Sequence, residues 1–174
     1  MSGRIVHADQ WIASKLNALA VRSPAWRYAS VFAGHHLFFF VVVFAFGAAW
    51  TLGAREAVGE RMGLLALCSG GAWIVRTLVS MSMRRQRPYQ TLPITRILQP
   101  TFETRSFPSG HAAASFGIAG FFLWFGFGWV GWIAVIAAGL ISTGRVCTGV
   151  HYPSDVFVGA AIGLLVSWAV RVVM

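Results

Sequence analysis

Long apolar blocks separated by shorter polar connections dominate the chain. About 20 apolar residues, at 1.5 Å per helical residue, cross a hydrocarbon core of about 30 Å. On this basis we expect five membrane-spanning helices, over residues 29–52, 61–83, 109–127, 129–142 and 154–173. The pattern predicts an all-α integral membrane bundle, built as a single domain over residues 1–174.

The segment before the first predicted span has a different pattern. Within residues 8–22, Ile12, Leu16 and Leu19 share one face of a helix, and Lys15 and Asn17 lie off that face. Such a helix is too polar to cross a bilayer, so we expect it to lie in the membrane interface. Asp9 is a possible N-cap of this helix.

Composition supports a membrane protein and narrows its partners. The chain is 57% hydrophobic with a mean hydropathy of +0.67, and 14 basic residues face only 5 acidic ones. A basic stripe or a recognised nucleic-acid-binding motif is missing from the sequence, so nucleic acid is not the expected partner. Arginine at membrane borders suits phosphate groups, because guanidinium offers a planar fork of donors.

The polar residues with catalytic chemistry fall at the ends of the predicted spans. Successive spans cross the membrane in opposite directions, so the start of an odd-numbered span and the end of an even-numbered one share a side. By this count one set of polar residues gathers on the same side of the membrane: Arg87, Ser109, His111, Arg145, His151 and Asp155.

Three of these residues, together with Gly110, can form a phosphate site. Ser109 is placed to cap the third span, which leaves the first N–H groups of that helix free to bind an anion. Gly110 lets the backbone approach a ligand closely. Arg87 and Arg145 bring positive charge from two other helix ends. Together they could stabilise the equatorial oxygens of a phosphoryl group during transfer.

Histidines supply the remaining chemistry. His151 has Asp155 four residues later, and the carboxylate could accept from one ring nitrogen and leave the other free to attack phosphorus. His111 would protonate the leaving oxygen. His35 and His36, in the first span, are expected to pack or to face lipid head groups; the alternative is that one of them lines the substrate entrance. The sequence offers no carboxylate cluster for a divalent metal, so we expect neither a metal nor another cofactor.

The order and spacing of these residues resemble a known family. Arg87-Pro88, then Pro108-Ser-Gly-His111, then Arg145 with His151 and Asp155, is similar to the type 2 phosphatidic acid phosphatases, which share their site with vanadium haloperoxidases and bacterial acid phosphatases. The resemblance implies an all-helical core and a phosphohistidine on His151 oriented by Asp155. It also implies proton donation by His111 and phosphate binding by Arg87, Ser109, Gly110 and Arg145.

Two positions depart from the family pattern. Ser80 stands where the first motif begins with lysine, and Gly144 stands where the third motif usually has serine. We expect Arg84 to supply the missing cation, because positions 80 and 84 share a helical face if the second span continues that far. Arg76 is the alternative; it would lie about a turn deeper and act behind the phosphate-binding residues.

These features together predict a metal-independent membrane phosphatase acting on a lipid phosphate or diphosphate. An isoprenoid diphosphate such as undecaprenyl diphosphate is preferred, because the compact loops leave little room for a large head group. Phosphatidate, phosphatidylglycerophosphate and lipid A remain alternatives, as do transfer of the phosphoryl group to another lipid and a catalytically silent lipid-phosphate-binding protein. The expected location is a bacterial inner membrane, with the orientation of the site left open.

Overall fold

The computed structural model describes residues 3–99 and 105–174, with side chains from Val6 onward, and every regular element in these ranges is a helix. In chain order the elements are α1 (Gly3–Val21), α2 (Pro24–Val31), the π-helix η1 (Phe32–His36), α3 (Leu37–Thr51), the 3-10 helix η2 (Arg55–Ala57), α4 (Val58–Ser82), α5 (Pro88–Thr91), α6 (Gly110–Trp124), α7 (Trp129–Cys147) and α8 (Pro153–Val173).

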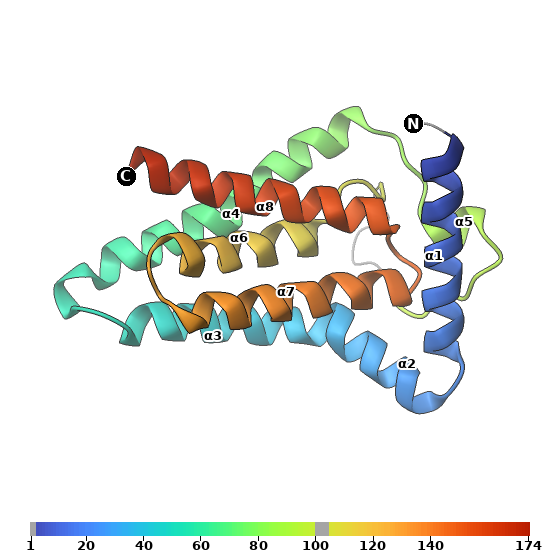
Figure 1. Ribbon diagram of the computed structural model, residues 1–174, viewed down its shortest axis with the longest axis horizontal. Helices are drawn as coiled ribbons and strands as arrows, with labels where there is room; N and C mark the ends of the chain where they lie inside the picture. The colour runs from blue at the N-terminus through green and yellow to red at the C-terminus, as the bar shows by residue number, and fades with distance from the viewer. Residues whose placement is uncertain (1–2, 100–104) are drawn as a thin grey trace.

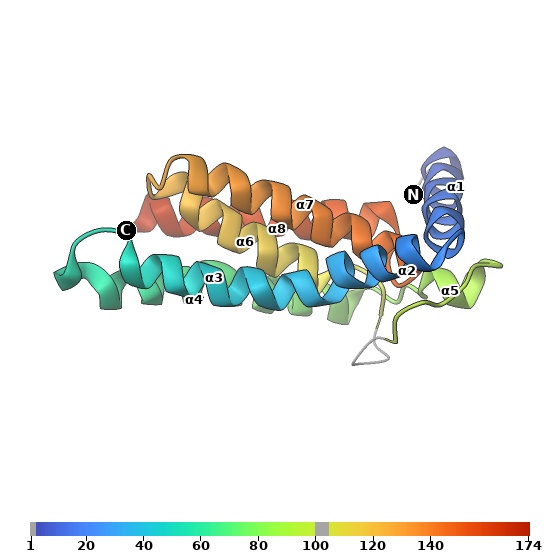
Figure 2. The same ribbon diagram turned by 90° about the horizontal axis from the view of Figure 1, so that it is seen from below.

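Helix α6 is the centre of the bundle. It packs against α8, α7 and α4, and Figure 2 shows it between α3 and α4 on one side and α7 and α8 on the other. Glycines permit the closest of these contacts: a Cβ on Gly163 of α8 would lie 2.4 Å from the carbonyl oxygen of Ala113. Close backbone packing of this kind is typical of small residues between membrane helices. It holds the first turn of α6 rigidly against α8.

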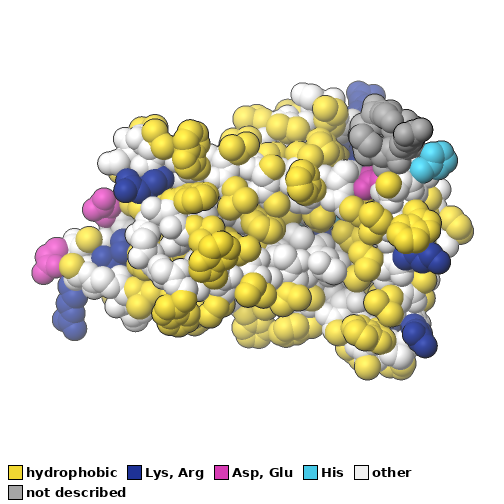
Figure 3. Space-filling view, viewed as in Figure 1, with side chains coloured by type: hydrophobic (Ala, Val, Ile, Leu, Met, Phe, Trp, Pro, Cys, Tyr) yellow, Lys and Arg dark blue, Asp and Glu magenta, His cyan; other side chains and the backbone are white. Residues whose placement is uncertain are grey.

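Four segments have the length and composition to cross a membrane: 24–51, 55–82, 129–147 and 153–173. They match four of the five predicted spans. Helix α6 has 15 residues, about 22 Å at the helical rise, and is therefore shorter than a typical hydrocarbon core. Figure 3 shows hydrophobic side chains over the middle of the molecule and charged side chains towards its two ends. The chain is thus an integral membrane protein with a short helix at its centre.

Helix α1 lies across one end of the bundle, beside α5 (Figures 1 and 2). It begins at Gly3, so the prediction that Asp9 caps its N-terminus is wrong. Asp9 is instead inside the helix and buried. Asn17 attaches the other half of α1: its Nδ2 donates to the carbonyl oxygens of Thr95 (2.8 Å) and Cys147 (2.9 Å). Two buried polar side chains therefore fix α1 to the bundle.

Candidate active site

The start of α6, the end of α7 and the start of α8, which carry most of the predicted site residues, lie at the end of the bundle that α1 covers (Figure 1). The backbone N–H of Ser109 donates to the carbonyl oxygen of Asp155 at 3.0 Å, which joins the start of α6 to the first turn of α8. Arg87 Nη1 donates to the carbonyl oxygen of Val150 at 2.8 Å and lies 3.5 Å from His151 Nε2. Residues more than 60 positions apart in the chain thus share one small volume.

His151, in the turn between α7 and α8, is 2% exposed. Its Nδ1 lies 2.7 Å from the carbonyl oxygen of Ser106, but 3.6 Å from Asp155 Oδ2. A carbonyl can only accept, so the proton is on Nδ1 and Nε2 carries the lone pair. The expectation that Asp155 accepts directly from the ring therefore needs correction, because the Ser106 carbonyl occupies that place.

Burial is the main cause that lowers the pKa of His151, to about 4; the nearby charges of Arg145 and Arg87 act in the same direction, and Asp155 opposes them. The ring is therefore neutral at pH 7. A neutral imidazole with its lone pair on Nε2 has the protonation state that nucleophilic attack requires.

Asp155 is fully buried and has three donors around its carboxylate. Oδ2 accepts from the Tyr152 N–H (2.8 Å) and from the Ser106 hydroxyl, and Oδ1 accepts from Arg85 Nη1 (2.6 Å). The position near the start of α8 adds the favourable field of a helix N-terminus. Asp155 therefore acts on His151 in two ways: directly, as a charge 3.6 Å from Nδ1, and through Ser106, whose hydroxyl it binds and whose carbonyl holds the ring.

Ser109 caps α6 as predicted, with its hydroxyl accepting from the Ala112 N–H at 3.5 Å. Gly110 follows at the first helical position, and a Cβ there would lie 3.1 Å from Arg76 Nε. His111 is next, with its ring centroid 4.7 Å from that of Phe38. The first turn of α6 therefore presents a helix N-terminus, an approachable backbone and an imidazole side by side.

Arg145, at the end of α7, is 4% exposed. Its Nη1 donates to the Gly34 carbonyl at 3.2 Å. Within the described part of the chain, the buried Nε–H of Arg145 has no hydrogen-bond partner. A buried charged donor without a partner is costly, and an anion would satisfy it. Both His111 and His151 are within electrostatic range of this guanidinium.

Gly144 explains one departure from the family pattern. A Cβ on Gly144 would lie 2.3 Å from the backbone nitrogen of Gly34, and a Cβ on Gly34 would lie 2.8 Å from the carbonyl carbon of Gly144. The π-helix η1, which contains Gly34, therefore touches α7 backbone to backbone, and a serine does not fit. π-Helical turns occur frequently at functional sites; here the turn supplies the carbonyl that holds Arg145.

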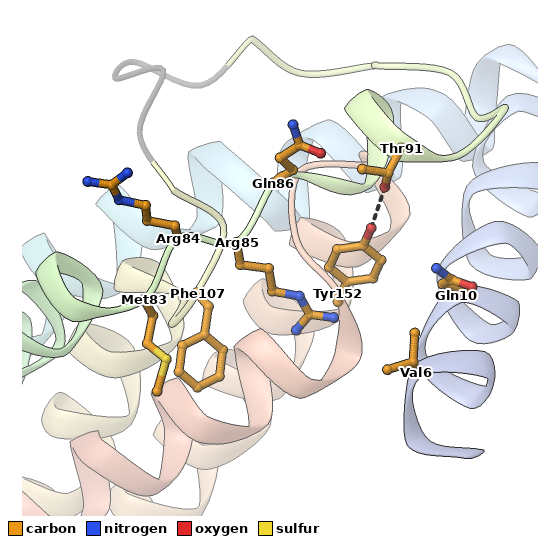
Figure 4. Close-up of a pocket in the computed structure, with 9 residues that line it drawn as sticks. All are labelled: Val6, Gln10, Met83, Arg84, Arg85, Gln86, Thr91, Phe107 and Tyr152. Atoms are coloured by element: carbon orange, nitrogen blue, oxygen red, sulfur yellow. Dashed lines mark hydrogen bonds between the residues drawn. The ribbon is translucent and has the colours of Figure 1, made fainter. Parts of the chain in front are cut away.

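Arg84 and Arg76 have different surroundings. Helix α4 ends at Ser82, so the helical face that was to carry Arg84 to the site ends before it. Arg84 is exposed, and in Figure 4 its side chain extends away from Arg85 and Tyr152 at a pocket of about 850 Å³. Arg76 borders Gly110, and its Nε donates to the Pro108 carbonyl at 3.1 Å. The structure therefore brings Arg76, and not Arg84, to the predicted phosphate site.

Sequence reasoning missed two residues of this arrangement, Ser106 and Arg85, and left the role of a third, His35, open. Ser106 and Arg85 contact Asp155, and His35 is within electrostatic range of Arg145 and His111. Ser106 acts largely through its carbonyl, which every residue has, so its type gave no signal. The π-helical turn that places His35 also has no local sequence signature.

The fold and these residues define a family. The model of the PAP2 superfamily matches residues 61–174, and the chain belongs to this family.

Individual proteins resemble the chain in sequence or in fold. An undecaprenyl-diphosphatase from Sulfolobus acidocaldarius is 35% identical over 49% of this chain and 42% of the relative. A decaprenylphosphoryl-5-phosphoribose phosphatase from Mycobacterium tuberculosis is 33% identical over 66% of this chain and 63% of the relative. These alignments span less than two thirds of either relative. A PAP2-type phosphatidylglycerolphosphate phosphatase from Bacillus subtilis has the same fold, with a TM-score of 0.71 at 23% identity over 99% of this chain and 87% of that one.

Proposed function

We propose that this protein is a metal-independent membrane phosphatase that hydrolyses a lipid phosphate or diphosphate. The observation that carries the proposal is the buried Arg145 Nε–H, which lacks a protein partner among the described residues and lies in electrostatic range of two histidines. A phosphoryl group bound there would satisfy this donor and lie in reach of a nucleophile and an acid. Arg87, Ser109 and Gly110 complete the phosphate site, with Arg76 taking the part expected of Arg84.

The reaction proceeds in two steps. His151 Nε2 attacks the terminal phosphorus, and the bond from that phosphorus to the leaving oxygen breaks. This oxygen belongs to the lipid alcohol of a monophosphate substrate or to the remaining lipid phosphate of a diphosphate substrate, and His111 gives it a proton. Water then attacks the phosphohistidine, His111 takes a proton from the water, and the bond from phosphorus to Nε2 breaks. Inorganic phosphate leaves and both imidazoles return to their starting protonation. The arginines neutralise the charge that develops on the equatorial oxygens.

Metal independence is supported by the donor set. Asp155 binds Arg85, Ser106 and the Tyr152 N–H, and Asp9 binds Arg85 and Ser154. Both carboxylates are therefore engaged in charge-assisted hydrogen bonds and do not offer the open oxygen ligands that Mg²⁺ or Ca²⁺ takes. Guanidinium groups supply positive charge at the phosphate instead.

An isoprenoid diphosphate is the substrate we favour. A groove of about 370 Å³, lined by apolar residues of α3, α6 and α7, begins at Leu37. This residue neighbours Phe38, whose ring contacts His111. A flexible hydrocarbon tail in this groove would bring its phosphate to the site, and two relatives are named for polyprenyl substrates. We place the protein in a bacterial inner membrane.

Phosphate release from detergent-solubilised protein tests the proposal. The panel contains undecaprenyl diphosphate, farnesyl diphosphate, phosphatidate and phosphatidylglycerophosphate, each with and without a chelator. We expect release that persists in chelator, is inhibited by vanadate, is fastest with the isoprenoid diphosphates and disappears in His151→Ala. Loss of release in chelator, or activity that survives His151→Ala, would contradict the mechanism.

A further inference from the structure

Asp9 is a buried carboxylate that the proposed reaction does not use. It is 4% exposed, on the face of α1 towards the bundle. Its Oδ1 accepts from the backbone N–H of Ser154 at 2.9 Å, and its Oδ2 accepts from the Ser154 hydroxyl at 2.6 Å and from Arg85 Nη2. Ser154 directly precedes Asp155. Helix α1 therefore binds the first turn of α8 beside its catalytic carboxylate.

Arg85 connects the two carboxylates. Its Nη2 forms the ion pair with Asp9, and its Nη1 donates to Asp155 Oδ1 at 2.6 Å. The guanidinium also lies over the Tyr152 ring, 3.9 Å from its centroid, and the Tyr152 hydroxyl shares a hydrogen bond of 2.6 Å with Thr91 (Figure 4). A planar fork bound on both sides and stacked on one face has a single orientation. That orientation fixes the Asp155 carboxylate.

Asp155 in turn binds the Ser106 hydroxyl, and the Ser106 carbonyl holds His151 Nδ1. A continuous series of hydrogen bonds therefore runs from α1 to the nucleophile. Asp9 is separated from His151 by Arg85, Asp155 and Ser106, and no contact in the series involves the residues that would bind phosphate.

We propose that Asp9 is a positioning residue for the reaction: by orienting Arg85 it sets the Asp155–Ser106–His151 geometry for attack. The inference rests on the proposed function. The inference also extends the proposed function, because α1 lies outside the part of the chain that the family model matches, residues 61–174. Docking of α1 onto the bundle is then coupled to catalysis through one carboxylate.

The test compares Asp9→Asn with Asn17→Ala in the phosphate-release assay. Asn17 is the other buried anchor of α1, and its contacts are with Thr95 and Cys147. We expect Asp9→Asn to lower kcat roughly 10- to 100-fold, as small misplacements of reacting groups do, with KM changed by less than about twofold. Asn17→Ala should lower the melting temperature but leave kcat within about threefold of the wild type. Equal losses of kcat in the two variants would show that Asp9 is only an anchor and would overturn the inference.

A double-mutant cycle tests the route. If Asp9 acts through Arg85, then Asp9→Asn in an Arg85→Lys background should lower kcat by less than about twofold more; additive losses would overturn the inference. If Asp9→Asn does not fold, Asp9→Ser, which keeps a hydroxyl acceptor for Ser154, takes its place in both comparisons.

A spectroscopic readout separates this inference from the proposed function. In ¹⁵N-histidine-labelled protein, the Nδ1–H proton of His151 should resonate at low field and should shift in Asp9→Asn but not in Asn17→Ala. This measurement needs no turnover. A wild type that hydrolyses none of the substrates defeats the proposed function, whereas an unshifted resonance in Asp9→Asn defeats the positioning role.

Discussion

Restoring the serine that the family usually has at position 144 should damage this protein. The Cβ of Gly144→Ser would lie 2.3 Å from the backbone nitrogen and 2.7 Å from the Cα of Gly34. Ordinary contacts between heavy atoms are about 3.5 Å, so η1 and α7 must separate by roughly 1 Å. Overpacking of this kind costs about 1–3 kcal/mol, and we expect the upper end because backbone atoms cannot rotate away. For a chain of this size that is a fall of roughly 6–12 °C in melting temperature.

The same displacement should reach the active site. Gly34 provides the carbonyl that binds Arg145 Nη1 at 3.2 Å. Moving η1 away from α7 breaks this bond and lets the guanidinium rotate, so phosphate binding should weaken with folding still intact. We expect kcat/KM in Gly144→Ser to fall at least tenfold, about 1.4 kcal/mol of transition-state stabilisation.

Gly139→Ser is the matched control, because it is the same substitution in the same helix and a Cβ at Gly139 meets nothing within 4 Å. Serine has a somewhat better helix propensity than glycine, so this variant should be as stable as the wild type or slightly more so. Melting is followed by a thiol-reactive or intrinsic fluorescence assay in detergent, alongside phosphate release. If Gly144→Ser melts and turns over like Gly139→Ser, the reasoning from close packing is refuted.

Three further variants or conditions test the site. Arg76→Gln should lower kcat/KM at least tenfold, while Arg84→Gln stays within about threefold of the wild type, both measured by phosphate release; the reverse order would reinstate Arg84. Ser106→Ala removes one hydrogen bond to a charged group, worth about 1.5–3 kcal/mol, and leaves the backbone carbonyl in place. We expect kcat to fall roughly 10- to 100-fold, and an unaltered kcat would contradict the role of this hydroxyl. Because burial lowers the pKa of His151 to about 4, the nucleophile stays neutral as pH falls below 6.5 and is lost only near pH 4. After correction for substrate ionisation by ³¹P NMR, kcat/KM should therefore keep its plateau at pH 5.5, and an acid limb centred near 6.5 would contradict this.

The fold was predictable because hydropathy fixes where helices can cross a bilayer. Four predicted spans correspond to helices of the structure. Their ends agree closely, except that the first and second helices begin earlier than predicted and the fourth span ends later than predicted. The cap at Ser109 was also predictable, because a serine directly before a helix commonly accepts a hydrogen bond from a backbone N–H of the first turn. Convergence of the polar residues followed from the alternation of span direction alone.

The features of the site that could not be predicted from the sequence depend on tertiary contacts. Asp9 was interpreted as a cap from its local position, but its partner, Arg85, is 76 residues away. Arg84 was predicted to supply the missing cation on the assumption that α4 continues to it, but the helix ends at Ser82. At this end Arg105 donates to the carbonyls of Ser80 and Met81, a contact between residues more than 20 positions apart. The reason for Gly144 became visible only when Gly34 was found against it.

The central claim is that His151 forms a covalent bond to phosphorus. The most direct measurement is rapid mixing with a ³²P-labelled isoprenoid diphosphate, quenched in alkali, followed by peptide mapping. The account predicts an acid-labile, alkali-stable label on the peptide that contains His151, formed within the first turnover and missing from His151→Ala. Turnover without any label on His151, or with the label on another residue, would contradict it.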